Sequence, residues 1–478
     1  MPDQKQNFIG GAWVEGEPAA NINPSNTTDI IGHYARANEA QTLDAIAAAK
    51  AAFPAWSRSG PLERHAILRR ASDEILARKD ELGTLLSREE GKTLAEGIGE
   101  TVRAAQIFDF FAGEALRLTG ETVPSIRPGV GVEITREAVG VVGIITPWNF
   151  PIAIPAWKLA PALCYGNTVV FKPADLVPGC AWALVDILQR AGLPDGVLNL
   201  VMGRGSVVGQ AIVQSADVDA LTFTGSVPTG TTLAMESAKL MRKSQMEMGG
   251  KNPFIVLADA DLDVAVDCVT QGAFFSTGQR CTASSRIIVE DAIHDQFLKA
   301  LSERISALKV GDALDPETQI GPVVDQSQLA QNEDYIRIGE AEGARLVTGG
   351  ERLNRPTEGF FQRPALFADC TNDMRIAREE IFGPVATVIR VKDYDAALEV
   401  ANDTDFGLSA GIATNSLKHA THFKRNAEAG MVMVNLPTAG VDFNVPFGGR
   451  KASSFGPREQ GRYAAEFYTT VKTAYTSA

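Results

Sequence analysis

The chain has 478 residues, of which 45% are hydrophobic and 22% charged, a composition typical of globular proteins. This length exceeds what one compact core accommodates, so we expect two or three domains. The formal net charge of -13 argues against nucleic acid and against an anionic membrane surface as partners, because both require a basic face.

Targeting signals and metal-ligand patterns are not evident in the sequence. The first residues lack a cationic segment leading into an apolar one, and no apolar run approaches the roughly 18 residues that span a bilayer. The five cysteines are odd in number, widely spaced and without zinc-ligand spacing. We therefore expect free thiols, a reducing cytoplasm, no membrane contact and no structural metal.

The first third of the chain reads as helical after a short strand-like entry over residues 8–14. Apolar periodicity predicts three helices, at residues 37–52, 61–77 and 95–118. Residues 120–138 then predict two short strands joined by a turn at Gly129-Val130-Gly131.

From Val139 onward, short apolar strands alternate with helices. The pattern predicts strands at 141–146, 167–172, 198–202 and 220–224, with helices at 153–165 and 180–191. A second alternating block over 252–435 predicts strands at 254–257, 285–289 and 386–391 and a helix at 261–273. Such βαβ repetition indicates doubly wound parallel sheets, in which ligands bind at the carboxyl ends of strands. The β-prone tail, residues 467–475, can complete a sheet, including that of a partner subunit.

Three residues could carry covalent chemistry. Cys281 lies between an arginine and a threonine, and a cationic neighbour favours the nucleophilic thiolate; the alternative is an inert buried thiol. Asn149, in a proline-flanked turn after the strand at 141–145, could donate to an oxyanion, worth roughly 3 to 4 kcal/mol; the alternative is a helix N-cap. Glu247 precedes a glycine pair that could move it as a general base; the alternative is a solvated carboxylate.

Three segments could hold a nucleotide. Lys172 and Asp175, after a strand, could bind a ribose, or could form a surface salt bridge. The turn from Phe223 to Gly230 leads into a helix N-terminus that offers free N–H groups to phosphate. It lacks the lysine of a P-loop, and no GxGxxG fingerprint is present. We read residues 203–209 as a loop beside the adenosine. Glu380 and Phe382 could bind a second ribose and pack a nicotinamide, or could form a surface turn.

Taken together and in this order, these segments resemble the aldehyde dehydrogenase superfamily. The resemblance runs from Phe8-Ile9-Gly10-Gly11 to Pro446-Phe447-Gly448-Gly449-Arg450-Lys451. The segments over residues 147–158 and 278–286 are similar to the α-ketoglutarate semialdehyde dehydrogenase group.

The resemblance implies an α/β fold with two doubly wound parallel-sheet domains and a small β arm. Residues 1–119 and 139–250 would form the NAD(P)-binding domain and residues 251–445 the catalytic domain. Residues 120–138 and 462–478 would form an oligomerisation arm, giving a homodimer or homotetramer.

The resemblance also implies the activity, which is NAD(P)-dependent oxidation of an aldehyde to a carboxylate. Cys281 would be the nucleophile, Asn149 and the Cys281 N–H would stabilise the oxyanion, and Glu247 would activate the hydrolytic water. The cofactor, NAD or NADP, would contact Thr146, Pro147, Trp148, Lys172, Asp175, Gly205, Gly209, Phe223, Gly225, Ser226, Gly230, Gly249, Glu380 and Phe382. The aldehyde would contact Phe150, Trp157, Arg280, Thr282 and Phe447.

Two departures from the family pattern bear on specificity. Asp175 stands where NAD-preferring relatives usually have glutamate, and the shorter side chain leaves room for a 2′-phosphate. Trp157 stands where succinate semialdehyde relatives carry a substrate-binding arginine, so a carboxylate-bearing semialdehyde needs another cation. Arg280 is our hypothesis, and the alternative is that it pairs with a structural acid.

Other functions remain as alternatives. They are oxidation of neutral aliphatic or aromatic aldehydes, a CoA-acylating enzyme, which would tend to lack Glu247, and a catalytically silent dinucleotide-binding scaffold. A cysteine hydrolase would need a histidine near these motifs, and none is present there.

Overall fold

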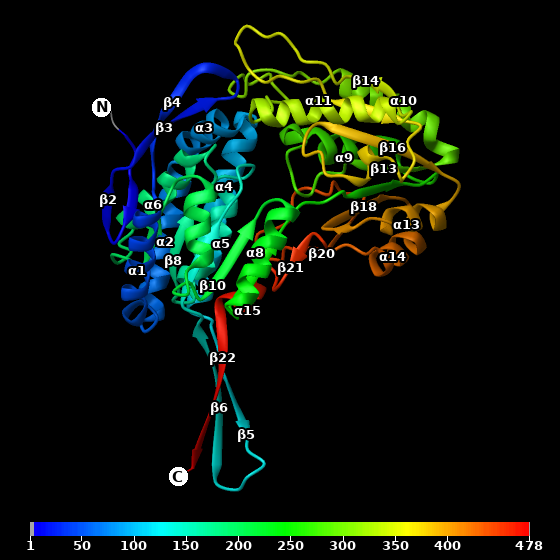
Figure 1. Cartoon of the computed structure of the whole chain (residues 1–478). Helices are drawn as coiled ribbons and strands as arrows, with labels where there is room; N and C mark the ends of the chain where they lie inside the picture. The colour runs from blue at the N-terminus through cyan, green and yellow to red at the C-terminus, as the bar shows by residue number, and fades with distance from the viewer. Residues whose placement is uncertain (1–3, 478) are drawn as a thin grey trace.

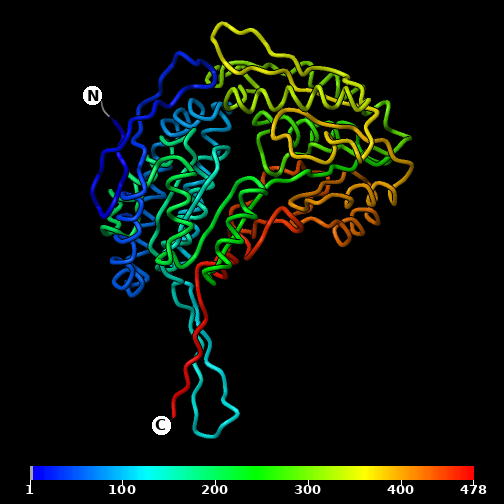
Figure 2. The backbone as a smooth tube through the Cα atoms, viewed as in Figure 1, coloured from blue at the N-terminus to red at the C-terminus, as the bar shows by residue number. Residues whose placement is uncertain are grey.

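The computed structural model describes residues 4–477, which form two sheet-containing halves and a projecting arm (Figure 1). The first half contains an eight-stranded sheet and the second a seven-stranded sheet. The tube through the Cα atoms shows the two halves side by side and the arm extending away from both (Figure 2). Among the helices within residues 4–477, none combines the length and apolarity needed to cross a membrane.

The first sheet has the strand order β2-β1-β9-β8-β7-β10-β11-β21. Its five central strands are parallel, whereas β1, β2 and β21 are antiparallel additions at the edges. The strands are β1 (Asn7–Ile9), β2 (Ala12–Val14), β7 (Val141–Ile145), β8 (Thr168–Lys172), β9 (Leu198–Leu200), β10 (Ala220–Thr224), β11 (Lys243–Glu247) and β21 (Ser454–Phe455).

Helices cover both faces of this sheet, which is why its central strands are continuously apolar. Successive side chains of β8 alternate between the faces. Val169 and Phe171 pack with α2, α4, α5 and α6, whereas Val170 packs with α1 and α7. The helices of this half are α1 (Glu39–Trp56), α2 (Pro61–Ala77), α3 (Lys79–Glu90), α4 (Leu94–Ala115), α5 (Ala153–Cys164), α6 (Pro178–Arg190), α7 (Gln210–Gln214) and α8 (Val227–Lys239).

The second sheet has the strand order β14-β15-β16-β13-β12-β18-β19, with only β14 antiparallel to its neighbour within the described chain. Its strands are β12 (Pro253–Val256), β13 (Arg286–Glu290), β14 (Arg345–Thr348), β15 (Ala365–Ala368), β16 (Val385–Val391), β18 (Ser409–Ala413) and β19 (Met431–Val434). One face packs on α9 (Leu262–Phe274) and α10 (Asp291–Ser306). The other packs on α11 (Gln326–Ala341), α12 (Arg375–Arg378), α13 (Tyr394–Asn402) and α14 (Leu417–Asn426).

The connection between the sheets positions the site. Strand β11 ends at Glu247, and β12 begins at Pro253. The carboxyl edge of the first sheet is therefore linked directly to the amino edge of the second. Cys281 and Glu380 precede β13 and β16, so both lie at that same amino edge. Residues on the two edges can face one another across the boundary.

The arm is a three-stranded antiparallel sheet of β5 (Glu121–Pro124), β6 (Val130–Ala138) and β22 (Thr469–Ser477). Strand β22 pairs with β6 from Thr469 opposite Ala138 to Ser477 opposite Val130. Beyond its first residue β22 is exposed, so this paired strand lacks the cover that the body strands have. The predicted hairpin and the β-prone tail thus form one element (Figure 1).

The structure corrects several details of the predicted elements. Helix α3 and the hairpin of β3 (Glu17–Asn23) and β4 (Asn26–Arg36) were not expected, because neither shows a clear apolar period. Strand β11 was also missed, since only Met246 in it is apolar. Residues 205–209 form the short helical turn η1 and not a loop. The tail begins with the short helix α15 (Ala465–Tyr468) before β22. The remaining elements are η2 (Phe275–Gly278), β17 (Phe406–Gly407), β20 (Arg450–Lys451) and η3 (Arg462–Ala464).

Asn167 joins the arm to the body through a fully used side chain. Its Oδ1 accepts from the N–H groups of Val139 and Gly140, at 2.8 and 3.1 Å. Its Nδ2 donates to the carbonyls of Ala162 and Tyr468, at 3.2 and 2.9 Å. The side chain is completely buried, so its loss removes four hydrogen bonds. It leaves the Gly140 N–H without a partner, whereas the Val139 N–H still donates to the Tyr468 carbonyl at 3.3 Å and the Ala162 carbonyl still accepts from the Asn167 N–H at 2.9 Å.

We predict that Asn167→Ala lowers the free energy of unfolding by about 3 kcal/mol, since one buried polar group left unpaired costs about 1 to 3 kcal/mol and each further hydrogen bond lost costs about 0.5 to 1.5 kcal/mol. Urea denaturation followed by circular dichroism measures this. Asn415→Ala is the matched control, because the exposed Asn415 side chain donates one hydrogen bond, to Asp259 O at 2.8 Å. Equal midpoints for the two variants would contradict the assignment.

Candidate active site

Cys281 opens onto a cavity of about 860 Å³ between the two halves. Its side chain is partly exposed, whereas the other four cysteines are buried. The lining is largely aromatic and aliphatic, with a cluster of charged residues on one wall. It includes all the predicted substrate residues, namely Phe150, Trp157, Arg280, Thr282 and Phe447.

Two aromatic side chains form one wall of the cavity. The rings of Trp157 and Phe447 stack with centroids 5.4 Å apart, and both residues are buried. Phe150 contributes a third ring, above which the Lys92 ammonium lies 3.8 Å from the centroid. Aromatic surfaces of this kind bind the apolar part of a small substrate while polar groups orient it.

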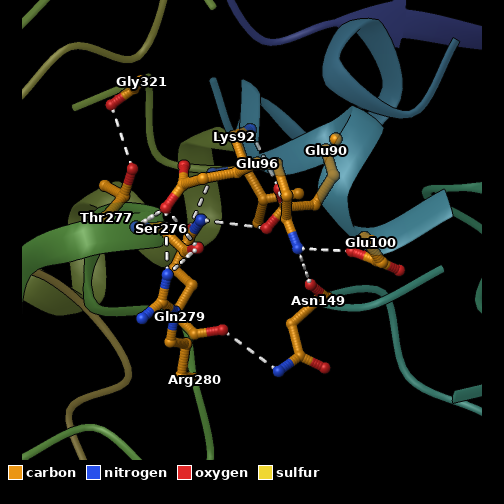
Figure 3. A network of polar contacts seen from close by, with 12 residues as sticks. Glu90, Lys92, Glu96, Glu100, Asn149, Ser276, Thr277, Gln279, Arg280 and Gly321 are labelled. Carbon is orange, nitrogen blue, oxygen red and sulfur yellow. Dashed lines mark hydrogen bonds and ion pairs between the residues drawn. The ribbon is translucent and has the colours of Figure 1, made fainter. Parts of the chain in front are cut away.

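Asn149 lies in the turn between β7 and α5, close to the cysteine segment. Its Nδ2 donates to the carbonyl of Gln279, two residues before Cys281, at 3.0 Å. The N-cap position of α5 is Ile152 and receives no side-chain hydrogen bond. The alternative role of Asn149 as a helix cap is therefore wrong, and its amide is directed towards the nucleophile segment (Figure 3).

A buried ion pair fixes this turn. The Lys92 ammonium donates to Glu100 Oε2 at 2.7 Å and to the carbonyl of Asn149 at 2.8 Å (Figure 3). Glu100 Oε1 accepts from the N–H groups of Ile152 and Ala153, both at 3.0 Å, at the start of α5. Burial alone would lower the pKa of Lys92, but Glu100 and Glu90 reverse this and hold it above its ordinary value.

Glu247 is the last residue of β11 and is only 2% exposed. The Ser454 hydroxyl donates to its Oε2 at 2.5 Å. Burial and then the nearby Glu459 raise the pKa of Glu247 well above its ordinary value, which favours the protonated carboxyl. The reading of Glu247 as a solvated surface carboxylate is therefore wrong. Glu459 is itself paired with the buried Lys158.

The environment of Cys281 differs from the prediction. Burial, followed by the negative charges of Glu380 and Glu247, raises the pKa of the thiol to about 12. The predicted help from Arg280 is wrong, because the Arg280 guanidinium pairs with Glu96 at 2.9 Å and also donates to Ser276 Oγ at 2.8 Å. The alternative reading of Arg280, pairing with a structural acid, is the one that the structure shows (Figure 3).

The carboxyl edge of the first sheet has the properties of a dinucleotide site. Strand order reverses between β7 and β10, the switch point at which α/β sheets bind ligands. The hydroxyls of Thr146 and Thr224, directly at these strand ends, are buried without a hydrogen-bond partner among residues 4–477. Such orphaned donors fit a polar ligand. Pro147 and Trp148 continue from β7, and Phe223 belongs to β10.

Neighbouring residues of this edge offer a polar pair that fits a ribose and a helix N-terminus that fits a phosphate. Lys172 ends β8, and its ammonium lies 3.8 Å from Asp175 Oδ1. Helix α8 begins after Ser226, so its first N–H groups point outward as an anion site. Gly225 and Gly230 pack tightly: a β-carbon would lie 2.4 Å from the Phe223 ring and 2.4 Å from Met248 Sδ, respectively.

A second cluster brings together three distant segments beside Cys281. The Gly250 N–H donates to Glu380 Oε1 at 3.0 Å. A β-carbon on Gly249 would lie 1.9 Å from Glu380 Oε2, so any side chain there would displace the Glu380 carboxylate. Phe382 has a φ of 61°, and its ring meets Trp148 edge-on with centroids 5.3 Å apart. Burial raises the pKa of Glu380 to about 7. These contacts argue against a simple surface turn.

Gly205 and Gly209 lie apart from these clusters, on η1. A β-carbon at either would meet open space within the described structure. Close packing of the protein does not explain them, and their contact with a cofactor stays a prediction.

Sequence reasoning missed several polar residues of the site. Lys92, Glu100, Lys158 and Ser454 were not singled out, although Lys158 is the one charged residue of the otherwise apolar α5. Glu96 and Arg103 were also missed, and with Glu100 they form a series along α4. Their spacing of four and three residues on α4 places them on one helix face, and this is the signal that could have identified them.

Comparisons with known proteins agree with this site. The model of the aldehyde dehydrogenase family matches residues 13–474. The chain therefore belongs to the aldehyde dehydrogenase family, and it is an NAD(P)-dependent oxidoreductase that converts aldehydes to acids.

Individual relatives are similar over their whole length. The chain is 43% identical to the α-ketoglutaric semialdehyde dehydrogenase of Bacillus subtilis, covering 98% of this chain and 97% of that one. It is 44% identical to the α-ketoglutarate semialdehyde dehydrogenase of Haloferax volcanii, covering 100% of both. The structure of betaine aldehyde dehydrogenase from Staphylococcus aureus in complex with NAD+ has a TM-score of 0.97 at 34% identity, covering 99% and 95%. An NADP-dependent enzyme of E. coli has a TM-score of 0.96 at 36% identity, covering 99% and 98%.

We predict that Glu380→Gln accelerates alkylation of Cys281 by iodoacetamide in the cofactor-free protein. At pH 8 Glu380, with a pKa of about 7, is mainly ionised and raises the thiol pKa. Removing this charge lowers that pKa, so the thiolate fraction rises by about threefold to tenfold. The amide keeps the acceptor for Gly250. Mass spectrometry of the labelled peptide over time gives the rate.

The difference between the two proteins should vanish at pH 5, where Glu380 is protonated in the parent protein. Cys281→Ala controls for labelling of the buried cysteines. Equal alkylation rates of parent and Glu380→Gln at pH 8 would contradict the electrostatic coupling.

Proposed function

We propose that the protein oxidises a small carboxylate-bearing semialdehyde, such as α-ketoglutarate semialdehyde, through a covalent adduct on Cys281. The observation that carries the proposal is the position of Cys281, which is the partly exposed cysteine of the chain and opens onto the aromatic cavity. The names of three relatives, from Bacillus subtilis, Haloferax volcanii and Saccharolobus solfataricus, support the substrate class.

Cys281 Sγ adds to the aldehyde carbon after losing its proton, and the carbonyl oxygen becomes an oxyanion. Asn149 Nδ2 carries two hydrogens and uses one on the Gln279 carbonyl. The other is free to donate to the oxyanion, together with the Cys281 N–H. The Lys92–Glu100 pair holds the Asn149 backbone during this step, so the donor needs no reorganisation.

Glu247 serves as the general base for the water that cleaves the thioester. Ser454 occupies Oε2, so Oε1 is the oxygen left to accept the water proton. Its raised pKa makes it a stronger base once it is ionised, and it reduces the ionised fraction at neutral pH. The rate of hydrolysis should therefore increase with pH as the Glu247 carboxyl ionises.

The dinucleotide fits the edge formed by Thr146, Thr224, Lys172 and the N-terminus of α8. Glu380 and Phe382 would hold its nicotinamide half beside Cys281. Held there, the oxidised nicotinamide would supply the hydride acceptor that oxidation of the cysteine adduct requires. Asp175, shorter than glutamate, leaves space for a 2′-phosphate, which is consistent with use of NAD and NADP.

The organisation of the chain follows from the same proposal. Residues 1–119 and 139–250 form the NAD(P)-binding domain, and residues 251–445 form the catalytic domain. Residues 120–138 and 462–478 form an arm that pairs with a second copy, giving a homodimer or homotetramer. Residues 1–3 and 478, which these bounds include, lie outside the described part of the chain. The exposed strand β22 supports this, because an uncovered strand edge is a template for pairing. We expect the enzyme to act in the cytoplasm.

The substrate proposal is tested by steady-state kinetics on four aldehydes with NAD and with NADP. We expect the largest kcat/KM on α-ketoglutarate semialdehyde, followed by succinate semialdehyde, with benzaldehyde and propanal at least about tenfold lower. Cys281→Ala should abolish oxidation of all four. A preference for benzaldehyde or propanal would instead favour a neutral substrate, and residual activity of Cys281→Ala would reject the covalent route.

The role of Glu247 is tested separately with Glu247→Gln, which is isosteric. Without the base, thioester hydrolysis should slow by about 10²- to 10⁴-fold. Rapid mixing should reveal a burst of reduced cofactor close to one equivalent per subunit, followed by slow turnover. An unchanged kcat in Glu247→Gln would contradict the role.

A further inference from the structure

The charged wall of the cavity contains three cations, Lys92, Arg103 and Arg280, together with acidic side chains. A substrate carboxylate needs a cation whose charge is not already neutralised by the protein. The contacts of the three therefore decide which one is available.

Lys92 and Arg280 are already paired. The Lys92 ammonium lies 2.7 Å from Glu100 Oε2, and the Lys92 side chain is 1% exposed. The Arg280 guanidinium lies 2.9 Å from Glu96 Oε1. A carboxylate arriving at either cation would have to compete with an internal carboxylate that is fixed in place.

Arg103 differs from both. No carboxylate lies within 4.0 Å of its guanidinium among residues 4–477. Glu100 and Asp442 act on it from farther away, and they raise its pKa by less than burial lowers it. Its one hydrogen bond to a protein acceptor in this part of the chain is long, from Nη2 to the neutral amide oxygen Gln460 Oε1 at 3.3 Å. Its Nε is buried without a partner. A guanidinium has five N–H donors, so most of its donor capacity faces no protein acceptor.

Helix geometry puts Arg103 on the wall that faces the substrate. Glu96, Glu100 and Arg103 follow one another at spacings of four and three residues along α4, and together with Gly99 they line the cavity. At a rise of 1.5 Å per residue, Arg103 lies about 10 Å along the helix from Glu96, the partner of Arg280. Arg103 therefore lies away from the segment that carries Arg280 and Cys281. The far end of an extended substrate bound to Cys281 would also lie away from that segment.

The neighbour that holds Arg103 is unusual in its backbone. Gln460 has a φ of 60°, a conformation that is unfavourable for residues other than glycine, and it is completely buried. It directly follows Glu459, whose carboxylate pairs with Lys158. This backbone conformation places the neutral amide of Gln460, and not the carboxylate of Glu459, beside the Arg103 guanidinium.

We propose that Arg103 binds the distal carboxylate of the aldehyde substrate, and that Gln460 positions its guanidinium without neutralising it. The assignment rests on the proposed semialdehyde oxidation and gives it a specificity-determining residue. It replaces Arg280 in that role. The burial that lowers the pKa of Arg103 is consistent with a cation that gains from an incoming anion.

The test compares matched aldehydes with and without the carboxylate. The measured quantity is the ratio of kcat/KM for succinate semialdehyde to that for butanal, and for α-ketoglutarate semialdehyde to pentanal. Arg103→Leu should lower both ratios by about 10- to 100-fold, the worth of a charge-assisted hydrogen bond. The loss should appear mainly in KM. Arg103→Lys, which keeps the charge but not the fork of donors, should lower them less.

Gln460→Glu is the second variant, and it retains Arg103. It places a carboxylate where the amide oxygen lies now, so it should neutralise the guanidinium and lower the same ratios. Product inhibition gives an independent readout: the inhibition constant of α-ketoglutarate should rise by about tenfold or more in Arg103→Leu and in Gln460→Glu.

Arg280→Leu is the matched control, because its charge is already paired with Glu96. It should change kcat/KM for the charged and neutral aldehydes by similar factors and so leave their ratio near the parent value. A lowered ratio in Arg280→Leu with parent ratios in Arg103→Leu and Gln460→Glu would overturn the assignment.

The outcomes also separate this inference from the proposed function. A parent enzyme that prefers butanal and pentanal would reject the carboxylate-bearing substrate itself. A parent enzyme that prefers the semialdehydes, with the preference intact in both variants, would keep the substrate and reject Arg103.

Discussion

The buried ion pair between Lys92 and Glu100 is the constraint on which the geometry of the site depends. It joins the segment before α4, the turn that carries Asn149 and the first N–H groups of α5. Both partners are almost completely buried. Removing one partner of such a pair strands a charge and typically costs 3 to 5 kcal/mol, so the three segments keep one arrangement.

The same low-polarity environment sets the protonation of the reacting groups. Cys281, Glu247 and Glu380 all have raised pKa values, each mainly because of burial and, for Cys281 and Glu247, also because of neighbouring carboxylates. The three groups are coupled, since ionisation of one carboxylate makes loss of the thiol proton harder. A site built in this way holds its nucleophile as a thiol until a nearby negative charge is neutralised. Arg280, which adjoins Cys281 in the sequence, does not lower the pKa of the thiol as predicted, because the charge of Arg280 is already paired with Glu96.

The sequence was informative where function lies at the ends of apolar strands. Residues at the ends of β7, β8 and β10 were predicted as a nucleotide edge, and the structure brings Thr146, Lys172 and Thr224 to adjacent strands of one sheet. The polar strand β11 was missed, although it positions Glu247. Strand β11 is hydrogen-bonded to β10 on one side and to β21 on the other. It contains no apolar run that would identify it in the sequence.

The partners of charged residues could not be predicted, because they come from far along the chain. Glu96 and Arg280 are 184 residues apart, and Arg103 and Gln460 are 357 apart. Local sequence identifies a cation but not whether an acid will neutralise it. That distinction decided between Arg280 and Arg103, and only the tertiary structure supplies it.

The position of Arg103 separates the recognition of substrate charge from the chemistry. Cys281 and Asn149 lie in connections between strands and helices, and Glu247 ends strand β11, whereas Arg103 lies within α4. This helix packs in the core through Ile107, Phe108 and Phe111. After burial, the groups that most raise the pKa of Cys281 are Glu380 and Glu247. A change of charge at this helix position can therefore alter which aldehyde binds without retuning the thiol. The aromatic wall of Trp157 and Phe447 would still accept the carbon chain. On this view the common chemistry of the site is fixed by the meeting of the two sheets, and the choice of substrate depends on whether one helical cation is left unpaired.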